Sequence, residues 1–441
     1  MPAPARIVAA AVTAAACLGA TAVPAAATTD TDAVISRGVT IPTFYNPPAT
    51  LPVADGALVR SEPLPLALSL PGIDGPLPGT ATRLMYKSTD SGGQPVAVTG
   101  AYIEPTAAWK GKGARPLVAV APGTMGQGDQ CAASLGLEHP LRFNGQTVSV
   151  GYETLAVYRL LAKGIAVVVT DYAGLGATDR LHTYVNRVDE AHAVLDAVRA
   201  ARSLPGTSVT AGSRVALFGY SQGGGATAAA AELQASYAPD VTLAGTYSGA
   251  PPADLAEVTK AIDGSDLAGA LGWSVNGFVQ SDPALRPIAD AHLNATGKAA
   301  LTDLSTMCVG DALFAYNSAR STAWTTDGRP ISDIIAEEPA LRAFLAEQRL
   351  GTVKPTGPVR VATGTSDNLV PHAQARQLAV DWCREGADVT YKYVALPDVG
   401  NALINHFAPL LTDQGEAISW LTDRLNGKPA TSTCSGLPAQ R

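Results

Sequence analysis

One serine of the chain has the surroundings of a nucleophile. Gly219-Tyr220-Ser221-Gln222-Gly223 fits the pattern G-x-S-x-G, with an apolar run before it and an alanine-rich run after it. That order predicts a strand, a sharp turn and a helix, so that the Ser221 hydroxyl is presented at the end of the strand. The alternative interpretation is an ordinary glycine-rich connection, because a chain with 43 glycines can match so short a pattern by chance.

A serine hydroxyl needs a base to take its proton and a carboxylate to orient that base. In proteins that present a serine on such a strand-to-helix turn, these partners follow the serine in the order acid, then histidine. Asp367 comes just after an apolar run, and His406 follows the last predicted strand. We therefore expect Asp367 as the orienting acid and His406 as the base. The alternatives are a turn-capping aspartate and a histidine packed in the core beside Phe407 and Leu410.

Two other residues compete for these functions. Asp398 is the rival acid, but it follows the last predicted strand, where the histidine loop is expected. His372 lies five residues after Asp367, so one loop would have to supply both acid and base. His182 and His192 fit a loop and a helix surface and are assigned no chemistry.

The negative charge that develops on an ester carbonyl oxygen needs two backbone N–H donors. One donor is expected from Gln222, directly after the serine, and the other from the loop APGTMGQGDQC, residues 121–131, at Thr124 or Met125. The alternative for this loop is a surface turn. A second glycine-rich loop, residues 171–179, does not fit G-x-G-x-x-G and is predicted to be a structural turn at the same edge of the sheet.

Alternating patterns predict the elements that hold these residues. Short apolar or β-branched runs predict strands at 81–89, 95–103, 115–123, 165–172, 213–220, 242–249, 358–367 and 389–398. Helical periodicity or an alanine-rich composition predicts helices at 151–164, 185–204, after Ser221, at 373–385 and near 413–425. This alternation predicts an α/β fold with a mostly parallel sheet and helices on both faces.

The same patterns divide the chain. Residues 28–80 are rich in proline and threonine and predict an irregular N-terminal arm, and residues 253–348 show short helical segments without a buried strand. The latter block predicts a helical cap inserted between two parts of the core, residues 81–252 and 349–427. Residues 428–441 are expected to form a C-terminal tail.

The first 27 residues are expected to be an export signal. Arg6 is the only charge before Asp30, residues 7–27 are apolar, and the alanines ending at Ala27 offer a cleavage site. The alternatives are an uncleaved membrane anchor and a lipoprotein attached at Cys17. After cleavage an even number of cysteines remains, which predicts two disulfides with three possible connectivities. These cysteines are Cys131, Cys308, Cys383 and Cys434.

The composition speaks against a nucleic-acid-binding protein and against a metal-binding protein. The net charge is −7 and no block of lysine and arginine occurs, so a nucleic-acid partner is not expected. The cysteines form no C-x-x-C pair, and we expect no metal and no cofactor.

The ordered set of motifs resembles a known family. GYSQGG, TSDNLVP and a late histidine, with a large insertion between the first two, are similar to the secretory lipases of the lipase A type, which are α/β-hydrolases with a helical cap from fungi and actinomycetes. VVTDYAGLG, VLDAVRAAR and the cysteine placement add to a resemblance over roughly residues 80–435. The resemblance implies a Ser221–His406–Asp367 triad and the disulfides Cys131–Cys308 and Cys383–Cys434. Two departures are a longer segment before the histidine and a short tail that lacks a flap some members carry.

We therefore expect a secreted, monomeric serine ester hydrolase, a triacylglycerol lipase or carboxylesterase of lipid catabolism, that works through an acyl-enzyme and contacts a lipid surface transiently. An acyltransferase or a peptidase of the same fold is an alternative within the same chemistry. A non-catalytic binding protein on a hydrolase scaffold is the alternative from another class.

Overall fold

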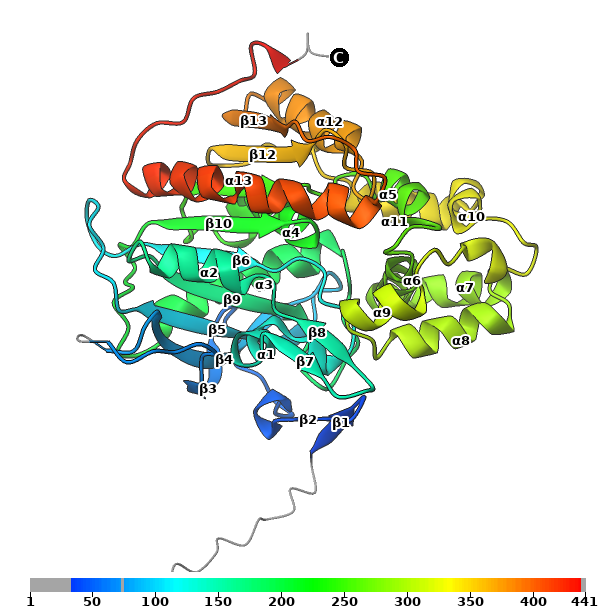
Figure 1. The fold of residues 1–441 in the computed structure, drawn as a ribbon, viewed down its shortest axis with the longest axis horizontal. Helices are drawn as coiled ribbons and strands as arrows, with labels where there is room; N and C mark the ends of the chain where they lie inside the picture. The colour runs from blue at the N-terminus through cyan, green and yellow to red at the C-terminus, as the bar shows by residue number, and fades with distance from the viewer. Residues whose placement is uncertain (1–32, 73–74, 438–441) are drawn as a thin grey trace, which may run out of the picture.

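A nine-stranded sheet crosses the molecule in the computed structural model, which describes residues 33–72 and 75–437 (Figure 1). The predicted export signal, residues 1–27, lies outside this part of the chain. The strand order is β13 (Val389–Val394), β12 (Val359–Gly364), β11 (Leu243–Gly249), β10 (Val215–Tyr220), β6 (Leu117–Ala121), β9 (Ala166–Ala173), β5 (Pro95–Pro105), β4 (Gly79–Thr89) and β3 (Leu58–Leu64).

The sheet has a parallel part and an antiparallel part. Strands β13 to β9 in this order are parallel to one another, whereas β5, β4 and β3 continue the sheet as an antiparallel meander. Strands β6, β9, β10 and β12 are buried along their whole length, which explains their nearly continuous apolar sequences. The carboxyl ends of the parallel strands therefore meet at one edge of the sheet.

Helices cover both faces, which confirms the predicted α/β architecture. Helices α3 (Arg187–Ser203), α4 (Gln222–Tyr237) and α12 (His372–Arg384) contribute to the apolar core on one face. Helices α1 (Ala133–Glu138), α2 (Thr154–Leu161) and α13 (Ala402–Leu425) contribute to the core on the other. Helix α4 is buried on nearly every side, and its small side chains let it fit between the sheet and α3.

The expected irregular arm, residues 28–80, contains regular structure in its described part, residues 33–72 and 75–80, which corrects the prediction there. Strands β1 (Val34–Ser36) and β2 (Val39–Ile41) form a small hairpin, and β3 pairs with β4 as an edge strand of the main sheet. The proline content hid β3, because Pro63 lacks the N–H that an interior strand needs. An edge strand tolerates that loss.

Between β11 and β12 the chain forms only helices and 3₁₀ turns, which are grouped at the right of Figure 1, beyond the carboxyl ends of the parallel strands. These helices share an apolar core of their own that includes the fully buried Trp273. They are α5 (Leu255–Ile262), α6 (Gly269–Ser281), α7 (Arg286–His292), α8 (Ala295–Leu304), α9 (Val309–Ala315), α10 (Ile331–Glu337) and α11 (Pro339–Gln348). We call this group the helical cap.

The last helix is longer than predicted. Helix α13 begins at Ala402 rather than near residue 413, so His406 lies in a helix and not in a loop. Asn401 caps this helix by accepting the N–H of Ile404 at 2.9 Å. Pro409 concealed the helix because proline is rare inside helices. No helix in the described part of the chain has both the length and the apolar character needed to cross a membrane.

Candidate active site

Ser221 lies on a sharp turn between β10 and α4. Its φ of 58° and ψ of −125° place it in a region that residues other than glycine seldom occupy. The neighbouring glycines make the turn possible. A Cβ on Gly219 would lie 2.0 Å from the carbonyl oxygen of Gly223, and a Cβ on Gly223 would lie 2.0 Å from that of Ala121. The chain therefore has the elbow geometry that the G-x-S-x-G pattern predicts.

The side chains of Ser221, His406 and Asp367 form a continuous hydrogen-bonded row. His406 Nε2 lies 2.9 Å from Ser221 Oγ, and His406 Nδ1 lies 2.7 Å from Asp367 Oδ2. The other carboxylate oxygen of Asp367 accepts the N–H groups of Leu369 and Val370 at 3.1 and 3.0 Å. Because Nδ1 faces a carboxylate, it carries the ring proton and leaves the Nε2 lone pair facing the serine hydroxyl. This arrangement can remove the serine proton.

The length of α13 explains how His406 reaches this position. Gly364, the last residue of β12, lets the ring of Pro409 pack against it, since a Cβ there would lie 2.5 Å from Pro409 Cγ. The Tyr220 hydroxyl donates to the carbonyl of His406 at 2.6 Å. These contacts fix the first turns of α13 against β10 and β12, whose ends carry Ser221 and Asp367.

The competing residues lie elsewhere. Asp398 is exposed and accepts hydrogen bonds from the Gly400 N–H and the Asn405 side chain at 2.8 and 2.7 Å. His372 begins α12, and its Nε2 lies 3.1 Å from the Tyr391 hydroxyl. In the residues that the structure describes, neither is hydrogen-bonded to Ser221.

The backbone beside Ser221 offers N–H donors. Thr124 and Gln222 line one cavity together with Ser221, and their N–H groups have no acceptor among the described residues. Met125 differs, because its side chain packs in the core with α1 and α2 and its carbonyl accepts the Val309 N–H at 2.8 Å. Of the two residues expected in this loop, Thr124 therefore has the position next to the serine.

Two side chains that the sequence analysis passed over hold the Thr124 loop. Glu153 Oε1 accepts the Gly123 N–H at 2.8 Å, and the Tyr152 hydroxyl donates to the Thr124 carbonyl at 3.0 Å. Burial raises the pKa of Glu153 to about 7, and the bond from Gly123 opposes that shift. The only sequence signal was a glutamate at the start of a predicted helix, which normally indicates helix capping.

A second buried group lies behind Gln222. His182, which was assigned no chemistry, is fully buried and lies within hydrogen-bond distance of the Gln222 side chain. Glu190 accepts a hydrogen bond from the same side chain. The sequence contained no sign of this arrangement, since both residues lie more than 30 positions before Gln222.

An apolar cavity in the helical cap lies next to the cavity at Ser221. The two cavities share the wall residues Thr259, Ser274 and Phe278. Beyond these the cap cavity is lined mainly by aliphatic side chains, among them Leu271, Val275, Leu285, Ile288, Ile331 and Ile334. The arrangement suits a substrate with a reacting group at Ser221 and an apolar chain in the cap.

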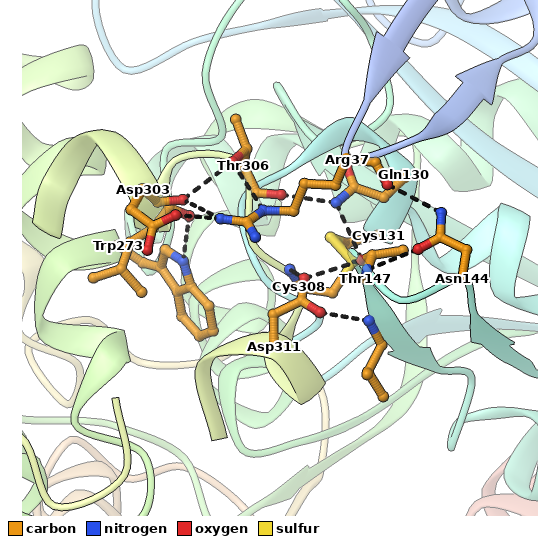
Figure 2. Close-up of a disulfide and its surroundings, with 12 residues drawn as sticks. Arg37, Gln130, Cys131, Asn144, Thr147, Trp273, Asp303, Thr306, Cys308 and Asp311 are labelled. Carbon is orange, nitrogen blue, oxygen red and sulfur yellow. Dashed lines mark hydrogen bonds and ion pairs between the residues drawn. A yellow bond between two sulfur atoms is a disulfide. The ribbon is translucent and has the colours of Figure 1, made fainter. Parts of the chain in front are cut away.

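A disulfide and backbone contacts connect the Thr124 loop to the cap. Figure 2 shows the disulfide, in which Cys131 is bonded to Cys308, the residue that precedes α9. Next to the disulfide, Gly126 and Cys308 form an isolated antiparallel bridge. The second disulfide joins Cys383 in α12 to Cys434 in the tail, so both pairs are those implied by the family resemblance.

Within residues 33–72 and 75–437, no cluster of three or more histidine, cysteine or acidic side chains could hold a metal ion.

Comparisons with known proteins identify the family and the fold of the chain. The model of the secretory lipase family matches residues 137–433. The chain is 30% identical over 395 residues to a probable inactive lipase of Mycobacterium tuberculosis, covering 88% of this chain and 82% of that protein. It is 26% identical over 403 residues to Lipase 10 of Candida albicans, and the match covers 89% of this chain and 82% of that protein. The structure of Candida antarctica lipase A in its closed state superposes with a TM-score of 0.72 at 20% identity, covering 88% of this chain and 87% of that one, which shows a common fold.

Proposed function

Because the chain belongs to the secretory lipase family and is a carboxylic ester hydrolase of the α/β-hydrolase fold, we propose that it hydrolyses lipid esters with Ser221, His406 and Asp367 as a catalytic triad. The observation that carries this proposal is the pair of hydrogen bonds of 2.9 and 2.7 Å that links the three side chains at the elbow.

In the proposed mechanism, Ser221 Oγ attacks the ester carbonyl carbon while His406 Nε2 takes the hydroxyl proton. Asp367 holds the ring and stabilises its positive charge. The N–H groups of Gln222 and Thr124 stabilise the negative charge on the carbonyl oxygen. The proton on Nε2 then passes to the leaving alcohol, and an acyl-enzyme remains. Water, activated by the same nitrogen, releases the acid and restores the serine.

The first test replaces the proposed nucleophile. Ser221→Ala is expected to lower kcat on a p-nitrophenyl ester by several orders of magnitude, with the melting temperature nearly unchanged. Ser236→Ala is the matched control, because Ser236 lies at the far end of α4, is exposed and donates its hydroxyl to the Leu233 carbonyl at 3.0 Å. A fluorophosphonate should label the parent protein and Ser236→Ala but not Ser221→Ala. Hydrolysis by Ser221→Ala at the parent rate would refute the assignment.

The substrate proposal concerns the acyl chain. The apolar cap cavity supports an ester whose acyl chain lies along α6, as in a triacylglycerol. Ser274→Phe should narrow the junction between the two cavities and lower activity on long-chain esters more than on short-chain esters. Ser281→Phe, on the same helix but outside both cavities, should leave the chain-length profile unchanged. Equal profiles for the two variants would place the acyl chain elsewhere.

A second candidate comes from one relative. The name of the Mycobacterium tuberculosis protein describes a probable inactive lipase, which favours a non-catalytic binding protein. The intact hydrogen bonds of Ser221 in this chain support catalysis instead. Absence of both labelling and ester hydrolysis in the folded protein would favour binding, and acyl transfer to added glycerol would favour a transferase.

We also propose that export removes residues 1–27. The secretory family and the two disulfides support an extracellular protein. N-terminal sequencing of the protein from the culture medium should begin at or near Thr28. A chain that retains residue 1, or one lipidated at Cys17, would contradict this proposal. Sedimentation should give a monomer, and added lipid vesicles should bind it reversibly.

A further inference from the structure

The side chain of Gln222 is anchored below the proposed site for the carbonyl oxygen. Its Nε2 donates to Glu190 Oε1 at 2.7 Å and lies 3.1 Å from His182 Nε2. All three residues are buried. The Gln222 amide group thus uses both of its hydrogens within the protein.

The protonation of His182 follows from its neighbours. His182 Nδ1 lies 2.9 Å from the Ala173 carbonyl, which can only accept, so Nδ1 carries the hydrogen. Its Nε2 is therefore an acceptor for Gln222. Burial lowers the pKa of His182 to about 4, so the ring is neutral near pH 7. The His182 ring also stacks on the Tyr172 ring, with the ring centroids 5.8 Å apart, and this contact fixes the plane of the imidazole.

Glu190 holds a strained part of the backbone with the same oxygen. Oε1 also accepts the Val185 N–H at 2.9 Å. Val185 has a φ of 56°, a value that β-branched residues rarely adopt, and it lines the cavity at Ser221. A purely local interpretation would make Glu190 a capping residue of α3. That interpretation does not account for the bond to Gln222, which lies 32 residues away.

The same segment also reaches the other proposed donor. The Tyr184 hydroxyl lies 2.7 Å from Thr124 Oγ1, and Tyr184 packs against Trp273 of the cap with ring centroids 5.8 Å apart. Gln222 is bound to this segment through His182 and Glu190. One stretch of chain, residues 182–190, thus connects the residues that bear both proposed N–H donors.

We propose that Glu190 is a positioning residue for ester hydrolysis: by holding the Gln222 side chain and the backbone of Val185, it sets where the Gln222 N–H meets the developing oxyanion. This inference rests on the proposed function. Glu190 has no contact with the substrate cavity in its own right, and its effect passes through Gln222. What matters is an acceptor at Oε1, so glutamine at position 190 should preserve the arrangement and an apolar side chain should not.

The test compares three variants. Glu190→Met removes the acceptor with little change in volume, Glu190→Gln restores an acceptor, and Asp196→Leu is the matched control. Asp196 is another buried carboxylate of α3, and it accepts the hydroxyl groups of Ser88 and Tyr237 at 2.7 and 2.6 Å, outside the segment 182–190. For each we would measure kcat and KM on a p-nitrophenyl ester, the inhibition constant of a trifluoromethyl ketone that forms a tetrahedral anion, and the melting temperature.

Glu190→Met should lower kcat and kcat/KM about 10- to 100-fold with KM nearly unchanged, because only the transition state uses the N–H. Binding of the trifluoromethyl ketone should weaken by a similar factor. Glu190→Gln should recover kcat to within about threefold of the parent. Asp196→Leu should lower the melting temperature without this loss of kcat. If Glu190→Met behaves like Asp196→Leu, the residue is structural and the inference is wrong.

A second variant covers the case in which Glu190→Met does not fold. Gln222→Ala keeps the backbone N–H and removes only the tether, so it should show the same loss of kcat and of ketone binding. Parent values for Gln222→Ala would overturn the inference. Ser221→Ala, assayed in parallel, separates the two proposals. If it remains active, the proposed function fails. If it is inactive while Gln222→Ala keeps parent activity, only the inference on Glu190 fails.

Discussion

Removal of the Cys131–Cys308 disulfide should affect both stability and catalysis. The bond joins residues 177 positions apart, and the Cys383–Cys434 bond joins residues 51 apart. In the chain-entropy model these closures stabilise the folded protein by about 5 and about 4 kcal/mol. Replacement of either pair by alanine should therefore lower the free energy of unfolding by similar amounts.

Ester hydrolysis should distinguish the variant that lacks the Cys131–Cys308 disulfide from the variant that lacks the Cys383–Cys434 disulfide. Cys131 ends the loop that carries Thr124, and Cys308 precedes α9 of the cap. Figure 2 shows the bond between the two cysteines. Without the disulfide, hydrogen bonds still join the loop to the cap, such as Val309 N–H to Met125 O at 2.8 Å and the Gln130 side chain to Thr306 O at 2.7 Å. These neutral bonds contribute about 1 kcal/mol each, so we expect a loss of kcat of up to about tenfold from a less fixed Thr124 N–H.

The assay combines urea unfolding with kinetics on active sites counted by fluorophosphonate. The Cys383/Cys434 double alanine variant is the matched control, because its bond ties the tail to α12 and leaves the Thr124 loop untouched. It should keep the parent kcat per active site at a temperature where both variants are folded. Equal kcat in both variants would refute the argument on loop positioning, and a loss below about 1 kcal/mol in both would refute the entropy estimate.

Three further predictions concern single residues. Asp367→Asn should keep the fold but lower kcat by about 10⁴-fold, because His406 loses the carboxylate that fixes its tautomer; stopped assays on esters would measure this. Gly224→Ala should destabilise the protein far more than Gly225→Ala in urea unfolding. A Cβ at Gly224 would lie 2.0 Å from a backbone oxygen of β11, whereas at Gly225 the nearest atom is 3.0 Å away in a proline ring. Glu153→Gln should gain stability relative to the parent as the pH rises. The parent binds a proton up to about pH 7 when folded but only up to pH 4.5 when unfolded. Its free energy of unfolding therefore falls through this window, by on the order of 1 kcal/mol per pH unit at most. Urea unfolding at pH 4.5 and pH 7.5 would show a difference that grows with pH, and a constant difference would contradict the shift.

The parallel strands could be predicted because their burial is evident from the residues of each strand alone. Strands such as β9 and β10 are buried on both faces, and their sequences are nearly continuous apolar runs. The start of α13 could not be predicted in the same way. Its first turns depend on the N-cap residue Asn401 and on the space that Gly364 leaves for the ring of Pro409. The contact between Gly364 and Pro409 is a tertiary contact, which the local sequence does not show. A helix whose defect is relieved by a distant glycine appears in the sequence as a loop.

The order of strands explains which parts of the site escaped prediction. Ser221, Asp367 and His406 could be proposed because each follows a recognisable strand and because the fold prescribes their order along the chain. The contacts of His182 and Glu190 depend on something else, namely that β6 lies between β9 and β10. This order brings the segment after β9, the Thr124 loop after β6 and the elbow after β10 side by side, although the chain separates them. Neighbours in a parallel sheet are set by crossovers and not by sequence distance, so the residues that position a catalytic group can come from the strand end beyond the adjacent one.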